Sequence, residues 1–248
     1  MIHGFLKACT VSPALRVADC AFNTQQTIAA MQRAAADGVQ LAVFPELGLT
    51  GYTCGDLFFQ QPLQRAAARG LAAVLEASAD LDLVALVGLP VAVDGKLYNC
   101  AAVVCHGKLL GLVPKTYLPN YGEFYERRQF NPAPAGVRTL HFAGQEVPFG
   151  TQLLFRCAEM PEFCLGVEVC EDLWAPLPPS THHALAGATV IANLSASDET
   201  IGKADYRRAL VSQQSARLLC AYLYADAGHG ESTTDMVFAA HDLICENG

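Results

Sequence analysis

The sequence predicts an α/β protein in which two mixed β-sheets pack together with helices on the outside. Between residues 5 and 89, apolar runs typical of buried strands alternate with helical segments, and this alternation predicts helices packed on a sheet. Between residues 90 and 113, tight-turn dipeptides join the apolar runs directly, which predicts antiparallel hairpins within the same sheets. The chain has 248 residues, 52% of them hydrophobic, enough for a large core.

The first part of the chain is expected to alternate strand and helix. Asn23 is the expected cap of the first helix, because its side-chain oxygen can accept a backbone N–H, and Gly38 is expected to end that helix. The second strand is almost continuously apolar, as in strands buried on both faces. The expected elements are strands at 5–11, 39–44 and 83–89 and helices at 23–37 and 64–79.

The hairpin region and the remaining elements follow in order. Asp94-Gly95 and His106-Gly107 are turn signals. Residues 116–136 show no clean period, and a loop this long inside a domain is usually functional. The other expected strands cover 90–93, 96–105, 109–113, 138–142, 152–157, 163–169, 189–193 and 221–224, with helices at 181–186 and 206–219.

Composition excludes several classes of function. The net charge of −8 and the lack of a basic run argue against nucleic-acid binding. Apolar stretches are too short to span a membrane, and the N-terminus lacks the layout of a signal peptide. The ten cysteines show no C-x-x-C spacing, so a zinc site is not expected, and their apolar surroundings favour reduced thiols in a cytoplasmic protein.

Three short segments each place one reactive side chain just after an apolar run. They are Phe44-Pro45-Glu46, Val113-Pro114-Lys115 and the segment around Cys170. A thiol, a carboxylate and an ammonium are the groups needed to attack a carbon–nitrogen bond through a covalent intermediate. The thiol is the nucleophile, the carboxylate moves protons, and the ammonium stabilises the oxyanion.

Each of these residues also has an ordinary structural interpretation. Cys170 could be a buried structural cysteine, Glu46 a capping carboxylate, and Lys115 a surface lysine at the start of a loop. In the functional interpretation, backbone N–H groups and a helix start near Cys170 favour the thiolate. Burial then raises the pKa of Glu46 and suits it to act as a base, and a buried Lys115 needs a partner, either Glu46 or Glu123.

Taken together, the segments resemble the nitrilase, or carbon–nitrogen hydrolase, superfamily. The resemblance covers nearly the whole chain in the right order. Three stretches are similar to the N-terminal glutaminase domain of glutamine-dependent NAD synthetases: residues 115–128, 170–174 and 193–199. The fold that this implies is a four-layer α-β-β-α sandwich with two mixed sheets.

The resemblance also implies roles for individual residues. Glu46 corresponds to the general base, Lys115 to the oxyanion-stabilising lysine, Cys170 to the nucleophile, and Glu123 to an additional carboxylate that orients the lysine and substrate. The side chains implied to form a glutamine pocket are Tyr121, Phe124, Glu171, Trp174, Ser197 and Lys203. For Trp174 and Lys203, a core aromatic and a solvated lysine remain the alternatives.

What the resemblance implies about partners and cofactors extends beyond this chain. L-glutamine is the implied substrate, a NAD synthetase domain in cis the implied partner, and a homo-oligomer the implied assembly. No phosphate-binding loop occurs in the sequence. No cofactor is therefore expected in this domain, and ATP and Mg are expected only in the synthetase domain. Residues 1–248 are expected to form one carbon–nitrogen hydrolase domain, truncated at its C-terminal end because Asn247-Gly248 is a turn signal without a following strand.

Two other functions stay open on the sequence alone. One is a free-standing amidase, nitrilase or carbamoylase that uses the same three residues on another small amide. The other is an inactive module that docks to a partner. Only the substrate pocket distinguishes the first of these from a glutaminase, and only reactivity of Cys170 distinguishes the second.

Overall fold

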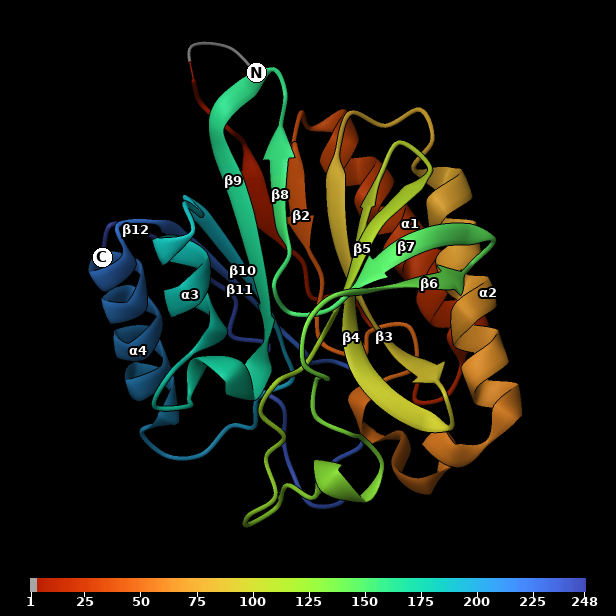
Figure 1. The fold of residues 1–248 in the computed structure, drawn as a ribbon. Coiled ribbons are helices and arrows are strands. Elements are labelled where there is room, and N and C mark those ends of the chain that lie inside the picture. The colour runs from red at the N-terminus through yellow and green to blue at the C-terminus, as the bar shows by residue number, and fades with distance from the viewer. Residues whose placement is uncertain (1–3) are drawn as a thin grey trace.

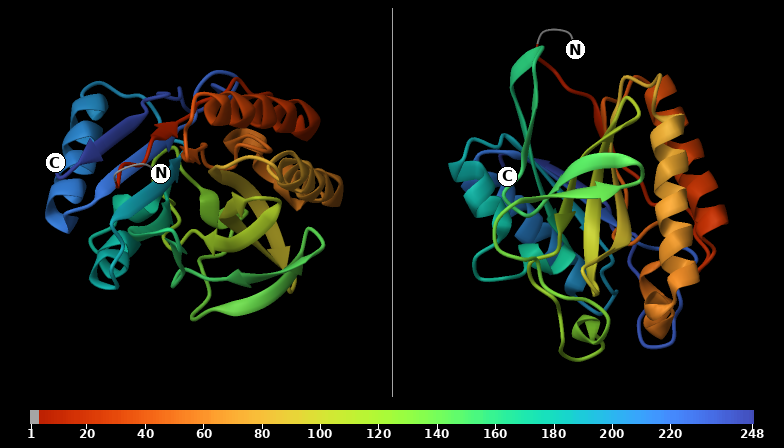
Figure 2. Two further views of the ribbon diagram at one scale, coloured as in Figure 1. Left: turned by 90° about the horizontal axis from the view of Figure 1, so that it is seen from above. Right: turned by 45° about the vertical axis from the view of Figure 1, so that its right-hand side comes forward.

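The computed structural model describes residues 4–248, which form four layers in the order helix, sheet, sheet, helix (Figure 1). Helices α1 (Cys20–Ala36) and α2 (Gln61–Ala77) cover one sheet. Helices α3 (Pro179–Leu185) and α4 (Lys203–Leu218) cover the other. The view from above shows the two sheets between the two pairs of helices (Figure 2). The expected α-β-β-α sandwich is confirmed.

The first sheet has seven strands in the order β1-β2-β3-β4-β5-β7-β6. Strands β1 to β3 are parallel, β3 to β5 form antiparallel hairpins, and β7 runs parallel to β5. The sheet is therefore mixed, as expected. Its strands are β1 (Ala8–Thr10), β2 (Leu41–Val43), β3 (Val84–Val93), β4 (Lys96–Cys105), β5 (Lys108–Pro114), β6 (Arg138–Phe142) and β7 (Gln145–Phe149).

The second sheet has five strands in the order β12-β11-β10-β9-β8. Its three central strands are parallel, and its two edge strands are antiparallel to their neighbours. This sheet is also mixed. Its strands are β8 (Leu154–Cys157), β9 (Met160–Val169), β10 (Val190–Ser195), β11 (Ala221–Asp226) and β12 (Leu243–Glu246).

Apolar side chains fill each of the three spaces between layers. Alternation along the strands sends one set of side chains toward the other sheet and the next set toward the helices. Between the sheets lie Leu41, Leu86, Val103, Val167 and Leu223. Beneath α1 and α2 lie Met31, Leu71 and Val87, and beneath α3 and α4 lie Ile191, Val211 and Tyr222.

Local signals located most elements but misplaced one cap. Asp94 and Gly95 both have positive φ, as the predicted hairpin turn between β3 and β4 requires. The expected N-cap at Asn23 is wrong, because α1 begins at Cys20 and the side chain of Asp19 accepts the backbone N–H of Phe22. The amide of Asn23 instead binds both backbone groups of Arg16.

Two strands were not expected from the sequence. Strand β7 follows a turn at Ala143-Gly144 and pairs antiparallel with β6. Strand β12 ends just before the turn signal Asn247-Gly248 and pairs antiparallel with β11. Strand β12 pairs with a strand that lies well before it in the sequence, and β7 contains Pro148. Signals from a single sequence do not resolve strands of either kind. In the described part of the chain, no helix has the length and apolar character needed to cross a membrane.

Candidate active site

The reactive side chains lie where strands of both sheets end. Glu46 follows β2, Lys115 follows β5, and Cys170 follows β9. Parallel strands bring their carboxyl ends to one edge of a sheet, and the face-to-face packing of the two sheets then brings the edges together. The backbone N–H of Glu46 donates to the carbonyl of Ser195, at the end of β10, over 3.2 Å. The site is therefore built across the two sheets.

A close backbone contact holds the segment that carries Glu46. A Cβ atom at Gly88 would lie 2.3 Å from the amide nitrogen of Leu47 and 2.5 Å from the carbonyl oxygen of Pro45. Only glycine allows β3 to pass this close beneath the segment. Leu47 itself has a φ of 51°. The turn that aims Glu46 into the protein thus depends on a glycine far from it in sequence.

The carboxylate of Glu46 is buried and has one free oxygen. Its Oε1 accepts from Lys115 Nζ and from Asn99 Nδ2, each over 2.6 Å. Its Oε2 is buried without a hydrogen-bond partner among the described residues. Burial is the main cause that raises the pKa of Glu46 to about 7, against the lowering effect of the Lys115 ammonium. Glu46 is therefore poised to accept and return a proton near neutral pH.

Lys115 is fully buried between two carboxylates. Its Nζ lies 2.6 Å from Oε1 of Glu46 and 2.6 Å from Oε1 of Glu126. Burial lowers the pKa of Lys115, but the two carboxylates outweigh it, so the net pKa lies well above its usual range. The side chain is therefore an ammonium. Since an ammonium has three N–H groups, these two contacts leave one available for an oxyanion.

The additional carboxylate expected at Glu123 is supplied by Glu126 instead. Glu126 lies in a short 3-10 turn, η2 (Glu126–Arg128), is buried, and also accepts from the Tyr52 hydroxyl over 2.7 Å. Glu123 is partly exposed, and no ion pair joins it to Lys115 in the part of the chain that the structure describes. The expectation for Glu123 is corrected because the turn at η2, and not distance along the loop, decides which acid points inward.

This correction gives a direct prediction. We expect Glu126→Gln to lower kcat roughly tenfold to a hundredfold, because Lys115 loses one of its two anionic partners. This loss is no larger than the loss that follows removal of an oxyanion donor itself. Glu123→Gln is the matched control and is expected to stay within about threefold of the unmodified protein. Ammonia release under saturating substrate measures both. A larger loss from Glu123→Gln than from Glu126→Gln would show that Glu123, as expected from the sequence, is the additional carboxylate.

Cys170 occupies a strained turn at the end of β9. Its φ is 47°, a left-handed value that costs a residue other than glycine free energy and is held only by surrounding contacts. It begins the 3-10 turn η3 (Cys170–Leu173). Its backbone N–H donates to Oδ1 of Asn193 over 2.9 Å. The thiol of Cys170 lies close enough to Glu46 and Lys115 for both charges to affect its pKa.

The groups around Cys170 oppose the thiolate, which the N–H groups of its turn were expected to favour. Its pKa is raised well above the usual value, first by burial and next by the negative charge of Glu46, while Lys115 lowers it. The short turn η3 does not offset two nearby carboxylates. Cys170 is therefore a thiol at neutral pH, and it needs a base to remove its proton as it attacks.

Asp172 joins the nucleophile's turn to the segment after Lys115. It is buried, and its Oδ1 accepts the backbone N–H groups of Thr116 and Tyr117 over 3.0 and 2.8 Å. Its Oδ2 accepts the N–H of Val169 over 3.0 Å. One carboxylate thus links the ends of β5 and β9 across the two sheets. From the sequence alone, Asp172 was expected only as part of a helix start.

The six residues expected to form a substrate pocket are joined by a series of contacts. Tyr121 donates its hydroxyl to Glu171 over 3.0 Å, and its ring lies 6.0 Å from that of Phe124. Nζ of Lys203 lies 5.6 Å from the Phe124 ring centroid and 5.4 Å from that of Trp174. Lys203 also pairs with Asp198. The structure thus joins aromatic, acidic and basic groups in one cluster, which includes Glu171, the residue after Cys170.

Ser197, the sixth residue expected in the pocket, is hydrogen-bonded to a buried arginine. Its backbone N–H donates to Asp226 over 2.7 Å, and its hydroxyl accepts from Arg207 over 3.1 Å. Arg207 is fully buried and also donates to the carbonyl of Asp198 over 2.7 Å. Arg207 could not be singled out from the sequence, because an arginine on a helix such as α4 is usually exposed to solvent.

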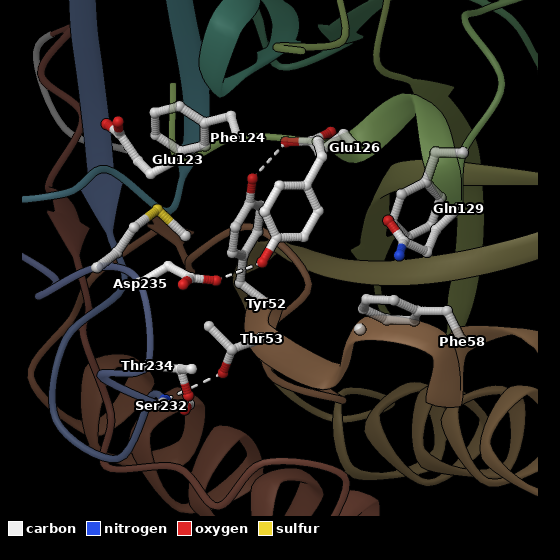
Figure 3. Close-up of a pocket in the computed structure, with 14 residues that line it drawn as sticks. Tyr52, Thr53, Phe58, Glu123, Phe124, Glu126, Gln129, Ser232, Thr234 and Asp235 are labelled. Carbon is white, nitrogen blue, oxygen red and sulfur yellow. Dashed lines mark hydrogen bonds between the residues drawn. The ribbon is translucent and has the colours of Figure 1, made fainter. Parts of the chain in front are cut away.

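Glu126 also lines a cavity of about 190 Å³ (Figure 3). Glu123 and Phe124 line it, together with Tyr52, whose hydrogen bond to Glu126 is drawn in the figure. Cys170 is not among the residues that line it. Within residues 4–248, no group of His, Cys, Asp or Glu side chains is arranged to hold a metal ion.

Comparisons with known proteins agree with this geometry. A family model for carbon–nitrogen hydrolases matches residues 8–232. The chain is 46% identical over 246 residues to a glutamine-dependent NAD(+) synthetase of Mycobacterium bovis, an alignment that covers 99% of this chain and 36% of that protein. The chain thus spans little more than a third of the length of this relative.

Solved structures show the same fold. The structure of a glutamine-dependent NAD(+) synthetase from Cytophaga hutchinsonii superposes with a TM-score of 0.85 at 29% identity, over 96% of this chain and 38% of that one. An amidase of the nitrilase superfamily from Nesterenkonia superposes with a TM-score of 0.76 at 19% identity, over 98% of this chain and 83% of that one. At this lower identity, the likeness is one of fold. From the family match along most of its length, the chain belongs to the carbon–nitrogen hydrolase family.

Proposed function

We propose that this chain is a glutamine amidohydrolase domain, which releases ammonia from L-glutamine through a thioester on Cys170. The observation that carries the proposal is the buried cluster in which the free oxygen of Glu46 and the ammonium of Lys115 lie beside the Cys170 thiol. The substrate comes from the relatives, such as the Mycobacterium bovis protein, that are named glutamine-dependent NAD(+) synthetases.

In the first proposed step, Cys170 attacks the side-chain carboxamide carbon while Glu46 Oε2 takes the thiol proton. The carbonyl electrons move to oxygen, and the third N–H of Lys115 stabilises this oxyanion. The N–H of Cys170 is already donated to Asn193, so we assign the second oxyanion donor to the next backbone N–H, that of Glu171.

In the second step, Glu46 returns the proton to the departing nitrogen, the carbon–nitrogen bond breaks, and ammonia leaves. A water molecule, deprotonated by Glu46, then attacks the thioester and releases glutamate and the free thiol. The same carboxylate accepts and donates a proton in turn. The pKa of about 7 that burial gives Glu46 suits both tasks at neutral pH.

The proposed pocket recognises both ends of the amino acid. Glu171 is proposed to pair with the α-ammonium, and Lys203 and Ser197 with the α-carboxylate. The Ser197 hydroxyl accepts from Arg207, which leaves its own hydrogen free to donate to a carboxylate. Tyr121, Phe124 and Trp174 are proposed to bracket the methylene groups, with Lys203 near the last two rings.

We extend the proposal to the protein in which this domain acts. The ammonia supplies ATP-dependent NAD synthesis in a synthetase domain in cis, where ATP and Mg are used, and the protein assembles as a homo-oligomer in the cytoplasm. Support comes from relatives that are about three times as long as this chain, with an alignment covering 36% of the Mycobacterium bovis protein. All ten cysteines are free thiols, which fits a reducing compartment.

Substrate profiling tests the proposal against a free-standing amidase. We expect ammonia release from L-glutamine, and little or none from simple aliphatic amides and nitriles, because those lack the charged groups that Glu171 and Lys203 pair with. Steady-state ammonia assays across these substrates give the comparison. A preference for acetamide or propionitrile over glutamine would favour the amidase or nitrilase function.

Covalent labelling tests the proposal against an inactive docking module. A glutamine analogue that carries a diazoketone electrophile should add once per chain, at Cys170. Mass spectrometry of the digested protein locates the adduct, and excess glutamine should slow its formation. Absence of labelling at Cys170, with equal labelling of other thiols, would support the docking module instead.

A further inference from the structure

A buried polar chain lies behind Cys170, on the face of the five-stranded sheet that α3 and α4 cover. It consists of Glu168 on β9, Asn193 on β10 and Tyr222 on β11, and each side chain is 0% exposed. None of the three has a part in the proposed chemistry. Burying a carboxylate and its polar neighbours costs folding free energy unless every group is paired. Such a buried chain therefore suggests a function.

Asn193 holds both backbone groups of the nucleophile. Its Oδ1 accepts the N–H of Cys170 over 2.9 Å, and its Nδ2 faces the carbonyl of Cys170 at 3.4 Å. Its Nδ2 also donates to the hydroxyl of Tyr222 over 3.1 Å. Because the backbone of Cys170 has the strained φ of 47°, this pair of contacts is positioned to stabilise the conformation that presents the thiol.

Glu168 favours one direction of these hydrogen bonds from the far end of the chain, and the hydroxyl of Ser195 supports the same orientation by donating to Asn193 Oδ1 over 2.8 Å. Glu168 accepts the Tyr222 hydroxyl at Oε1 and the N–H of Ser180 at Oε2, the second over 2.7 Å. An ionised carboxylate can only accept, so the Tyr222 hydroxyl must point its hydrogen at Glu168. The same hydroxyl must then accept from Asn193, and this turns Nδ2 toward Tyr222 and Oδ1 toward the N–H of Cys170.

We propose that Glu168, Tyr222 and Asn193 are positioning residues, in which the carboxylate of Glu168 sets the orientation of the Asn193 amide and the amide holds Cys170 in its reactive turn. The inference rests on the proposed function only in taking Cys170 as the nucleophile. It concerns the placement of the thiol and not the choice of substrate.

The substitution Glu168→Gln isolates this effect, because it keeps size and reverses polarity. The fixed N–H of Ser180 requires the amide oxygen, so the amide NH₂ faces Tyr222 and donates to it. Asn193 also presents its NH₂ to Tyr222, so the hydrogen of the Tyr222 hydroxyl no longer has an acceptor in this chain. If Asn193 flips, its NH₂ meets the N–H of Cys170 and its oxygen meets the carbonyl. At least one mismatch therefore persists whether or not Asn193 flips.

A second substitution should relieve this mismatch. Tyr222→Phe removes the hydroxyl that transmits the reversed polarity, so Asn193 keeps its contacts with Cys170. We expect kcat to fall roughly tenfold or more for Glu168→Gln, only a few-fold for Tyr222→Phe, and no further in the double variant than in Tyr222→Phe alone. KM for glutamine should stay within about twofold throughout, since none of the proposed pocket residues is changed.

Tyr224→Phe is the matched control. Tyr224 lies two residues further along β11, on the same face, and is equally buried. Its hydroxyl has no hydrogen-bond partner among the described residues, so its removal should leave kcat unchanged. Thermal unfolding of every variant shows whether each is folded. A purely structural role predicts that Glu168→Gln, which removes a buried charge, leaves kcat unchanged while stability rises or holds.

The proposal is overturned if Glu168→Gln retains kcat within twofold, or if the double variant loses the product of the two single losses. It is also overturned if Tyr224→Phe loses as much as Tyr222→Phe. Alkylation of Cys170 by iodoacetamide is measured in the same variants. If the unmodified protein does not hydrolyse glutamine, the proposed function fails, but the order of alkylation rates still decides whether these residues position Cys170.

Discussion

Replacing Cys170 with alanine is expected to abolish ammonia release from glutamine. Cys170 is the thiol that lies against Glu46 and Lys115, and no other side chain there can form the thioester. Alanine has the same difficulty as cysteine with a φ of 47°, so the turn is no more strained in the variant than in the parent. Loss of turnover would therefore report loss of the nucleophile. Ammonia release and mass-spectrometric detection of the acyl-enzyme measure the effect.

Cys164→Ala provides the control for this experiment. Cys164 is buried on β9, six residues before Cys170, and takes no part in the site. Its replacement should lower stability modestly through lost packing and leave kcat near the parent value. Retention of most activity by Cys170→Ala would remove the basis of the proposed mechanism, whatever the behaviour of Cys164→Ala.

Replacing Glu46 with glutamine is expected to lower kcat by roughly a hundredfold to ten-thousandfold, the usual contribution of general acid–base catalysis. Lys115 and Asn99 both donate to Oε1, so the amide oxygen of the variant takes that place. Its NH₂ then occupies the position of Oε2 and cannot accept the thiol proton. Lys115 retains Glu126 as an anionic partner, so the fold should survive. A loss of only a few-fold would make Glu46 a structural residue.

The pH dependence of kcat/KM tests the role of the Glu46 carboxylate independently. Burial raises the pKa of Glu46 to about 7, and the group acts as a base only when ionised. We therefore expect kcat/KM of the parent to fall as the pH drops below about 7, approaching tenfold per unit. The residual activity of Glu46→Gln should lack this acidic limb. An unchanged limb in the variant would assign the titration to another group.

Local chemistry explains why much of the fold could be predicted from the sequence. The Asp94-Gly95 turn and the continuous apolar runs depend on neighbours a few residues away, and the structure has the corresponding hairpin and buried strands. The cap of α1 was misplaced because Asp19 and Asn23 are both good capping residues, and the pairing of Asn23 with Arg16 depends on the loop before the helix. Strand β7 was missed because its short run contains Pro148.

For the site, the type of chemistry could be predicted but its supporting residues could not. A thiol, a carboxylate and an ammonium after three apolar runs pointed to Glu46, Lys115 and Cys170, and the structure joins them. The partner of Lys115 was assigned to Glu123 and is Glu126, because an irregular loop has no period from which the inward-facing residue can be counted. The roles of Asn99, Asp172 and Arg207 likewise appear only once distant strands are adjacent.

The sequence by itself therefore determined the layered fold and the order of most of its elements, which follow from periodicity and turn chemistry, and its resemblance to the carbon–nitrogen hydrolases singled out the three reactive groups. Only the tertiary structure decided the protonation states and the positioning contacts. The pKa values of Glu46 and Cys170 are raised mainly by burial, and burial depends on which segments pack together. The chain from Glu168 through Tyr222 to Asn193 crosses three strands, so its hydrogen-bond direction exists only when β9, β10 and β11 lie side by side.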